Sequence, residues 1–465
     1  MAEMDRGEEA QAGKNIDSVL SRIGFGRYQI YVFCIVGIGQ VADGMEMTAI
    51  ALLTPVLEET WDLSLFQMGL LGGVIFVGMT LGNAITACLG DTCGRLTLMR
   101  HSTLLLFLSS LISGLMPEYY SFLCTRFFVG TAAGMLIPIS VTYCTEVCPK
   151  EQRGGFLVAL NVCFVAGMVL IIGLAWAFIG TSGNSAWRYV LILASIPVLF
   201  AHICLLFYIQ ESPRFLANQW QYGAAVLSLN TIADSNGRAK LDRAERCAIE
   251  AFSPVGVTPG LRKVKRMLEG RAGEVTGPLA VLWFAVVFTY YGLLFLIPNT
   301  FSSSAPQSSY FLLLLSALVQ LPSVAISLLT IDHPNIGRKH TITLSLFAQT
   351  ASFGAAALVN NTDFQWISLV AAMFFISIWF NTLYPYTGEL YHTSMRALAL
   401  GSLGIVGRLA GAVAPLLLLE LKSVGTQLPF LFLGLVSLIA AINALCIPFE
   451  TRNTALDLQT TDSSP

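Results

Sequence analysis

The sequence predicts an all-α membrane protein in which twelve transmembrane helices form two pseudo-symmetric six-helix bundles. The first observation is composition: 55% of the 465 residues are hydrophobic and 12% are charged, whereas soluble domains carry roughly 25% charged residues. The second is a series of apolar runs long enough to cross about 30 Å of hydrocarbon as helices. The third is a repeated signature, Glu146-Val-Cys-Pro-Lys-Glu-Gln-Arg153 and Glu389-Leu-Tyr-His-Thr-Ser-Met-Arg396, which ends the fourth run of each half. This repeat indicates an internal duplication.

Each predicted helix corresponds to one apolar run, and short polar connections separate the runs. Because a helix rises about 1.5 Å per residue, roughly 20 residues suffice for one crossing. An even number of crossings places both termini on one side of the membrane. The runs lie near residues 28–53, 66–89, 97–115, 119–144, 156–179, 186–208, 278–298, 309–330, 341–359, 364–387, 398–419 and 428–448.

The distribution of basic residues predicts which side holds the termini. Lys and Arg accumulate on cytoplasmic loops. The connections after the odd-numbered helices contain one unambiguous base, Lys422, with Arg188 at the start of the sixth helix. We therefore expect an integral multi-pass protein of the plasma membrane or of an intracellular vesicle membrane, with both termini cytoplasmic. We expect the protein to contact the lipid bilayer and to be monomeric.

Polar interruptions divide the chain into five predicted segments. Residues 1–27 form a cytoplasmic N-terminal segment without a signal-peptide pattern, so the first span is expected to act as an uncleaved anchor. Residues 28–215 and 278–450 form the two bundles. Residues 216–277 form a charged cytoplasmic linker, and residues 451–465 form a polar tail.

Several motifs carry a resemblance to a known family. The turn Gly90-Asp-Thr-Cys-Gly-Arg95 and the sequence Glu211-Ser-Pro-Arg-Phe215, followed by Pro448-Phe-Glu-Thr-Arg452, resemble the sugar-porter-like and organic-ion-porter-like members of the major facilitator superfamily. The strings Ala42-Asp-Gly-Met-Glu-Met47 and Tyr386-Thr-Gly-Glu-Leu-Tyr-His-Thr-Ser-Met-Arg-Ala397 are similar to the branch of synaptic-vesicle-two-related proteins and bacterial niacin permeases. The second copy of the turn carries two extra residues before its Gly-Arg pair. The resemblance implies the major facilitator fold.

The resemblance also implies a cytoplasmic gate. In that family such charges join the two bundles on the cytoplasmic side when the carrier faces outward. The alternative is that they are structural caps, because cytoplasmic helix ends are routinely charged. The predicted gate residues are Asp91, Arg95, Glu146, Arg153, Glu211, Arg214, Arg338, Glu389, Arg396 and Glu450.

Charged residues inside the spans are candidates for function, because an ionisable group at mid-bilayer is costly. Asp43 and Glu46 lie three residues apart and therefore on one face of the first helix. In proton-coupled sugar carriers of the superfamily, an acid in helix 1 pairs with an arginine in helix 4, and Asp43 and Arg126 resemble that pair. Because the two residues lie on facing helices of one bundle, we hypothesise that protonation of Asp43 releases Arg126 and couples proton entry to substrate entry. The alternative is a permanent, non-functional ion pair.

A second arginine, Arg408, lies among small residues in the eleventh helix, where it can bind a carboxylate through paired hydrogen bonds. Organic-anion carriers of related branches also place an arginine there, although Arg408 could instead bond backbone carbonyls or Glu389. Polar and aromatic side chains in other spans could line the same cavity, or could belong to interfacial belts and helix contacts. The predicted substrate-binding residues are Glu46, Asn161, Tyr290, Tyr291, Gln320, Asn381, Tyr384 and Arg408.

We therefore expect a secondary active transporter that moves a small polar organic solute by alternating access. The favoured solute is an organic anion or zwitterion, such as a nicotinate-like carboxylate. Protons are a candidate coupling ion. The alternatives are a sugar or organic-cation carrier, and a non-transporting receptor or vesicle protein with the same fold. The net charge of −2 gives no indication of nucleic-acid binding. The five histidines show no metal-like clustering, and neither a P-loop nor a hydrolase pattern is present. No cofactor, metal or catalytic residue is expected, and the chain is not expected to be an enzyme.

Overall fold

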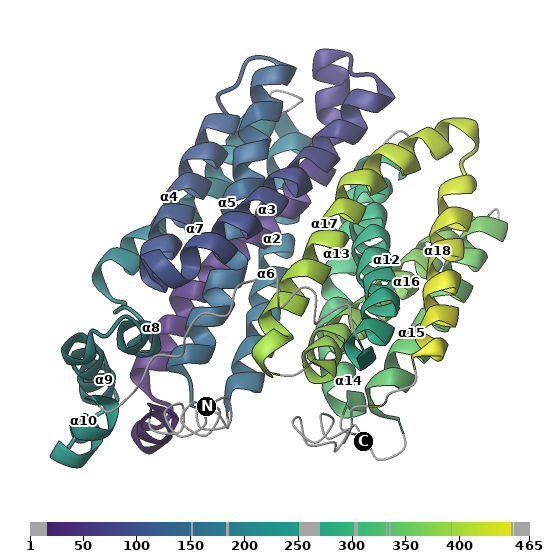
Figure 1. The fold of residues 1–465 in the computed structure, drawn as a ribbon. Coiled ribbons are helices and arrows are strands. Elements are labelled where there is room, and N and C mark those ends of the chain that lie inside the picture. Colours follow the sequence, from purple (N-terminus) through teal and green to yellow (C-terminus); the bar gives the residue numbers. More distant parts are fainter. Residues whose placement is uncertain are drawn as a thin grey trace.

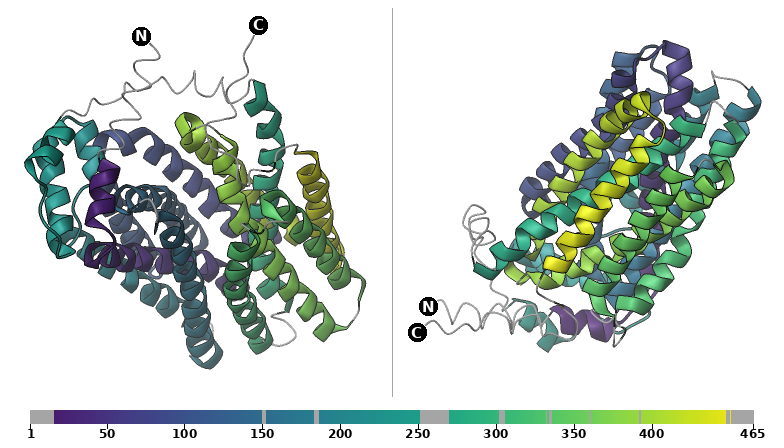
Figure 2. Two further views of the ribbon diagram at one scale, coloured as in Figure 1. Left: turned by 90° about the horizontal axis from the view of Figure 1, so that it is seen from below. Right: turned by 90° about the vertical axis from the view of Figure 1, so that its right-hand side faces the viewer.

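Two groups of long helices make up the molecule (Figure 1). The computed structural model describes residues 16–149, 152–182, 186–250, 270–301, 306–331, 333, 336–359, 361–391, 393–447 and 450. Within these ranges, twelve helices are long and apolar enough to cross a membrane. The predicted all-α membrane fold and its number of spans are confirmed. Figure 2 shows the two groups side by side, the N-terminal half in purple to teal and the C-terminal half in green to yellow.

The first bundle is built from six helices, and three shorter helices follow it in the chain. The bundle helices are α2 (Arg27–Trp61), α3 (Leu65–Cys93), α4 (Arg95–Ser113), α5 (Tyr119–Val147), α6 (Arg153–Ser182) and α7 (Trp187–Phe207). The shorter helices are α8 (Pro213–Asn218), α9 (Tyr222–Ser235) and α10 (Arg243–Glu250). We call the end of the molecule that holds α8–α10 the linker end, and the other end the opposite end (Figure 1).

The second bundle repeats this arrangement with one broken helix. Its elements are α12 (Gly270–Phe301), α13 (Pro306–Leu318), α14 (Gln320–Ile331), α15 (Gly337–Leu358), α16 (Thr362–Leu390), α17 (Thr393–Val424) and α18 (Leu428–Cys446). The single span that the sequence predicts over 309–330 is divided between α13 and α14 at Val319. Pro322 explains the break, because its ring clashes with the carbonyl of the residue four positions earlier, Leu318, and offers that carbonyl no N–H.

Local signals set several helix ends. Ser64 begins α3 with a capping box, in which its side chain accepts from the backbone N–H of Gln67 and the Gln67 side chain accepts from the backbone N–H of Ser64 at 2.9 Å. Asn361 begins α16 by accepting from two backbone N–H groups. Asp62 ends α2 in the left-handed conformation (φ 49°). Because it ends at Asp62, α2 runs to Trp61, beyond the predicted edge at residue 53.

The two bundles meet most closely where α3 packs against α17. Gly73 of α3 lies so near α17 that an added Cβ would be 2.5 Å from the carbonyl oxygen of Ala412. Close backbone approach through small residues is how membrane helices associate without a hydrophobic driving force. Since α2 starts at the linker end, α3 starts at the opposite end, and Gly73 is in the opposite half of the seam. The bundles are therefore packed together in that half.

Candidate functional site

A charged pair of residues faces the seam from the two bundles. Asp43, in the middle of α2, is only 4% exposed, and its Oδ1 atom has no hydrogen-bond partner. The strongest charge acting on it is Arg408 of α17, ahead of its neighbour Glu46. A buried acceptor without a partner costs about 1–3 kcal/mol. The seam therefore contains an acid from one bundle and a guanidinium from the other, as the sequence predicts for these two residues individually.

Asn83 of α3 holds Arg408 in place. With its amide oriented to satisfy both neighbours, the Asn83 oxygen accepts from Arg408 Nε at 2.6 Å and its nitrogen donates to the carbonyl of Gly134 at 2.7 Å. One side chain thus ties α17 to α3 and α5. Sequence reasoning missed Asn83, although an amide inside an apolar span is a signal that could have identified it.

Aromatic rings form a continuous chain beside these charges. Tyr290 and Tyr291 of α12 are adjacent, with ring centroids 4.9 Å apart. Tyr384 of α16 is 48% exposed, so its ring borders open space. Asp43 and Arg408 both act electrostatically on Tyr291 and Tyr384. The remaining centroid distances are 4.7 Å for Phe76–Tyr291, 5.9 Å for Tyr290–Phe380, 5.6 Å for Phe380–Tyr384 and 4.7 Å for Trp283–Tyr384.

Gln320 joins this wall because the helix is broken beside it. The Tyr290 hydroxyl donates to Gln320 Oε1 at 3.0 Å. The Gln320 amide nitrogen donates to the Ser316 carbonyl at 3.1 Å and contacts the sulfur of Met168, in the first bundle, at 3.6 Å. The structure therefore brings together Asp43, Tyr290, Tyr291, Gln320, Tyr384 and Arg408 of the predicted site, and adds Asn83, Met168, Phe76, Trp283 and Phe380.

The predicted pairing of Asp43 with Arg126 is wrong in this structure. Arg126 Nη1 donates instead to Glu46 Oε2 at 2.7 Å, and both side chains are 0% exposed. Ser110 donates to the other oxygen of Glu46. Glu46 is thus part of the interior of the first bundle, nearly a turn beyond Asp43 on α2, at the level of Arg126 on α5. Glu46 is therefore bonded inside the first bundle, and its contact with the solute stays a prediction.

Two predicted amides stand apart from the hydrogen-bond network at the seam. Asn161 is exposed on α6, and Asn381 is half-buried on α16 next to Phe380. Their roles stay predictions. Among the described residues, no group of three or more His, Cys, Asp or Glu side chains could hold a metal ion.

The predicted gate charges of the first bundle gather around the start of α4. Arg95 Nη2 lies 3.1 Å from Glu146 and 3.0 Å from Asp91, and Arg95 Nη1 donates to the Gly90 carbonyl at 2.8 Å. Glu211 accepts from the backbone N–H of Arg95 at 3.0 Å. A carboxylate at a helix N-terminus satisfies free N–H groups and the positive end of the helix dipole.

The second bundle repeats this cluster around the start of α15. Arg338 Nη2 lies 3.1 Å from Glu389, and Arg338 Nη1 donates to the Ile331 carbonyl at 2.7 Å. Glu450 accepts from the backbone N–H groups of Arg338 and Lys339, each at 2.9 Å. The two extra residues of the second turn leave these contacts intact, because Arg338 reaches a carbonyl seven residues back where Arg95 reaches one five back.

A third cluster involves a residue that sequence reasoning did not select. Asp17, in the helical residues 16–23, accepts from Arg153 at 2.7 Å and from Arg214. Each of these ion pairs lies within one bundle or its attached segments, so they do not join the bundles in this conformation as expected for a gate in an outward-facing carrier. The side chain of Arg396 lies outside the described residues.

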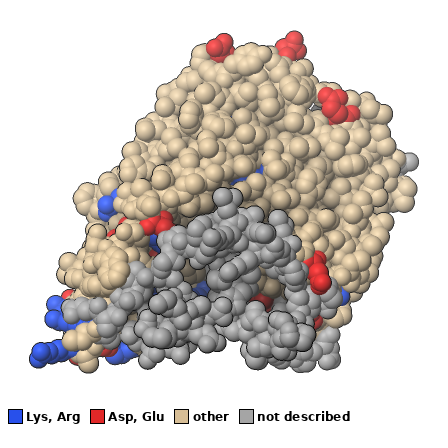
Figure 3. Space-filling view, in the orientation of Figure 1, with Lys and Arg blue, Asp and Glu red and all other residues tan. Residues whose placement is uncertain are grey.

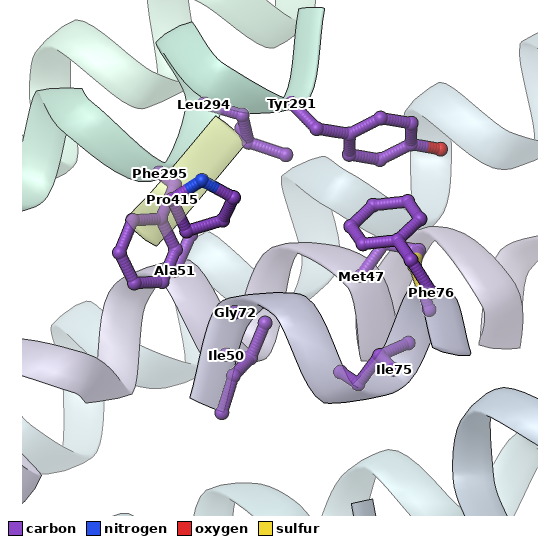
Figure 4. A pocket seen from close by; sticks show the side chains of 10 residues that line it. All are labelled: Met47, Ile50, Ala51, Gly72, Ile75, Phe76, Tyr291, Leu294, Phe295 and Pro415. Carbon is purple, nitrogen blue, oxygen red and sulfur yellow. The ribbon is translucent and has the colours of Figure 1, made fainter. Parts of the chain in front are cut away.

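A small apolar cavity lies in the opposite half of the seam. Its free volume is about 10 Å³, about what one water molecule needs. Figure 4 shows Phe76 and Tyr291 on one side of it and Pro415 on another. This cavity is too small and too apolar for a polar organic solute. Together with the close approach of Gly73 to Ala412, this small cavity indicates that the bundles pack tightly at these residues.

Known proteins with similar sequence or fold include two that are named as transporters. The Synaptic vesicle 2-related protein of Xenopus laevis is 27% identical, over 95% of this chain and 82% of its own length. Organic cation/carnitine transporter 7 of Arabidopsis thaliana is 26% identical, over 94% of each chain. The partially occluded, inward-open structure of the xylose transporter XylE from E. coli superposes with a TM-score of 0.74 at 15% identity, covering 91% of this chain and 100% of that chain. Residues 36–415 match the Major Facilitator Superfamily, and the chain therefore belongs to this family of multi-pass membrane transporters of small solutes.

Proposed function

We propose that this protein is a secondary active transporter that moves a small organic anion or zwitterion by alternating access. The observation that carries the proposal is Arg408. It lies on the second bundle, is anchored across the seam by Asn83 of the first bundle, and acts on the buried Asp43. A residue that spans the seam senses any relative movement of the bundles. It can therefore couple solute binding to the change of access.

The chemistry of Arg408 supports an anionic group on the solute. Asn83 occupies the Nε–H of its guanidinium, which leaves the two terminal nitrogens of this half-buried side chain for other partners. Terminal guanidinium nitrogens match the two oxygens of a carboxylate. The neighbouring aromatic wall supports a solute with an apolar or aromatic body.

The packing of the seam supports an inward-facing conformation. The bundles are packed together in the opposite half, while the charged clusters of the linker end are paired within their own bundles. On the face seen in Figure 3, most of the visible basic side chains lie toward the linker end, where acidic ones lie too, whereas the opposite end shows acidic ones. By the positive-inside rule this distribution supports a cytoplasmic linker end. The name of the Xenopus relative supports a vesicle membrane as the location.

Proton coupling stays part of the proposal, with Asp43 as the acid at the seam and Glu46 as the buried partner of Arg126. The Glu46–Arg126 bond is charge-assisted and fully buried, so the loss of either charge would leave the other without its partner.

Uptake into proteoliposomes tests the proposed function. Purified protein should accumulate labelled carboxylates, nicotinate included, when an inward proton gradient is applied. Arg408→Gln should reduce uptake by tenfold or more, because the carboxylate loses its partner. The control Arg243→Gln removes an exposed arginine of α10 and should leave uptake unchanged. Undiminished uptake by Arg408→Gln would refute the role of Arg408.

A second candidate is an organic cation, since Asp43 is an unpartnered acid beside an aromatic wall and the Arabidopsis relative is named as an organic cation/carnitine transporter. Charge reversal separates the two candidates. Arg408→Glu should abolish carriage of an anion and leave, or increase, carriage of a cation.

A further inference from the structure

We propose that the solute is a zwitterion whose cationic group meets Asp43 and the aromatic wall while its carboxylate meets Arg408. This inference rests on the proposed function and narrows it. It makes Asp43 the residue that selects zwitterions over simple anions.

The carboxylate of Asp43 has an unpartnered oxygen. Oδ1 is buried and has no hydrogen-bond partner, whereas both oxygens of the nearby Glu46 have one. A buried acceptor is normally paired. An acceptor that is left vacant at the seam between two moving bundles is suited to a donor or a cation that arrives with the solute.

The two opposite charges at the seam, Asp43 and Arg408, are not bonded to each other. Of the ion pairs that the described residues form, none joins Asp43 to Arg408, although each charge acts on the other. Arg408 is held by Asn83 instead. A separation between fixed opposite charges matches a solute that carries its own two charges a few bonds apart.

Aromatic rings lie near both charges. Asp43 and Arg408 both act on Tyr291 and on the half-exposed Tyr384. The faces of tyrosine and tryptophan rings attract ammonium groups, and the attraction increases when water is excluded. The Trp283 and Phe380 rings extend this surface on either side of Tyr384. A quaternary or aromatic ammonium group fits this environment better than a neutral group of the same size.

Charge balance at the seam also favours a zwitterion. The opposite charges of Asp43 and Arg408 offset each other, and a zwitterion adds no net charge when it binds between them. A simple anion adds an uncompensated negative charge, and a simple cation adds a positive one. Burying an uncompensated charge is costly.

Ligands matched in shape test the inference. Nicotinate, N-methylnicotinate and N-methylnicotinamide share one ring and are an anion, a zwitterion and a cation at pH 7.5. A compact set with one aliphatic shape consists of 3,3-dimethylbutanoate, trimethylglycine and choline. Binding to the purified full-length protein is measured by thermal shift and by isothermal titration. We expect the zwitterion of at least one set to bind tenfold or more tightly than both of its counterparts.

Asp43→Asn tests the residue. This near-isosteric change should weaken binding of the zwitterion by tenfold or more and leave the anion unchanged or tighter. The control Glu59→Gln removes a carboxylate from the exposed end of the same helix and should preserve the preference. Cooperative unfolding shows whether Asp43→Asn is folded. If it is not, the binding of the same ligands to Asp43→Glu and to the wild-type protein serves as the test.

The outcomes separate this inference from the proposed function. If the anion binds best in wild-type protein and Arg408→Gln weakens it, the zwitterion inference fails and the anion transporter stands. If the zwitterion preference survives in Asp43→Asn, the role of Asp43 fails. If no ligand of either set binds, both the inference and its parent proposal are overturned for solutes of this size.

Discussion

The buried charged side chains of the first bundle differ in how many of their polar atoms have a hydrogen-bond partner. Glu46 is bonded to Arg126 and Ser110, but the Nε and Nη2 atoms of Arg126 have no partner. The Phe122 ring lies 5.1 Å from the Arg126 guanidinium and supplies a cation–π contact. Each charge of this pair therefore depends on the other, because a buried charge without its partner would be uncompensated.

Removing one member of this pair should destabilise the protein strongly. We expect Glu46→Gln or Arg126→Gln alone to lower the free energy of unfolding by about 3–5 kcal/mol, because each leaves a buried charge uncompensated. The double change Glu46→Gln with Arg126→Gln should recover a substantial part of that loss. Denaturant unfolding in detergent measures both effects, and strictly additive losses would contradict the buried pair.

Asp17 should make stability depend on pH. Burial alone would raise the pKa of Asp17, but the Arg214 and Arg153 guanidiniums outweigh burial and hold the pKa below its usual value. The stabilisation is thus complete above the unfolded-state pKa of about 3.9 and is lost as pH falls through the lower folded-state value. Its expected size at neutral pH is about 1.5–3 kcal/mol, the range of hydrogen bonds to charged groups.

Thermal unfolding between pH 7 and pH 3 measures this dependence. Wild-type protein should lose more stability on acidification than Asp17→Asn, which should already be less stable at pH 7. The control Asp363→Asn changes an exposed acid at the opposite end. Equal pH profiles for wild type and Asp17→Asn would exclude the proposed contribution.

At the scale of whole elements, the start of α4 in the first half corresponds closely to the start of α15 in the second half. Gly94 directly precedes α4 and Gly337 is the first residue of α15, with φ of +95° and +71°, and each faces the carboxylate that caps its helix. A Cβ at Gly94 would lie 2.4 Å from Glu211, and one at Gly337 would lie 2.8 Å from Glu450. Glycine is needed in both turns for its conformation and for the space that the carboxylate occupies.

Alanine at either glycine should destabilise the protein to a similar extent. Gly94→Ala and Gly337→Ala should each cost about 1–3 kcal/mol through backbone strain, plus the displacement of the capping carboxylate. The matched control is Gly237→Ala, which has φ of +65° but nothing within 4 Å of the added Cβ. It should show the strain alone. Unfolding measurements should therefore rank Gly237→Ala as the mildest, and the reverse order would contradict the capping role.

For the whole molecule, the packing of α3 against α17 decides which end of the seam is closed. This contact is made by small residues in the opposite half, and Lys422 at the end of α17 also acts on Glu58 at the end of α2. A carrier that alternates must separate these surfaces in its other state. Both states must lie within a few kcal/mol of each other, or one would hold the whole population.

A larger side chain at Gly73 should prevent closure of the opposite half. Gly73→Leu should abolish transport, because its Cβ would overlap the Ala412 carbonyl in the closed state, but it should still permit folding in the other state. Labelling of a cysteine introduced at Ala51, which lines the small cavity, reports the opening in a background without native cysteines. The control Gly354→Leu has open space at the added Cβ and should transport normally. Unchanged labelling of Gly73→Leu would argue against this account of closure.

Residue patterns alone predicted the twelve spans, the duplication and most of the seam residues. Span length and the cost of charge in hydrocarbon constrain these features locally, so Asp43 and Arg408 could be selected from their positions in apolar runs. The partner of Arg126 could not be selected in this way, because Asp43 and Glu46 share one face of α2 and only the height of α5 beside it distinguishes them. Asp17 gave no signal at all, since a polar N-terminal segment contains many equivalent acids.

The amino-acid sequence by itself determined that this is a duplicated, twelve-span membrane protein, because hydrophobic length and repeated charge motifs are local properties. Only the tertiary structure decided that Glu46 is buried with Arg126, that Asp43 is left vacant at the seam, and that Asn83 fixes Arg408 across it. These contacts depend on the relative rotation and height of helices that are distant in the chain. Packing sets that geometry, and no run of residues contains it.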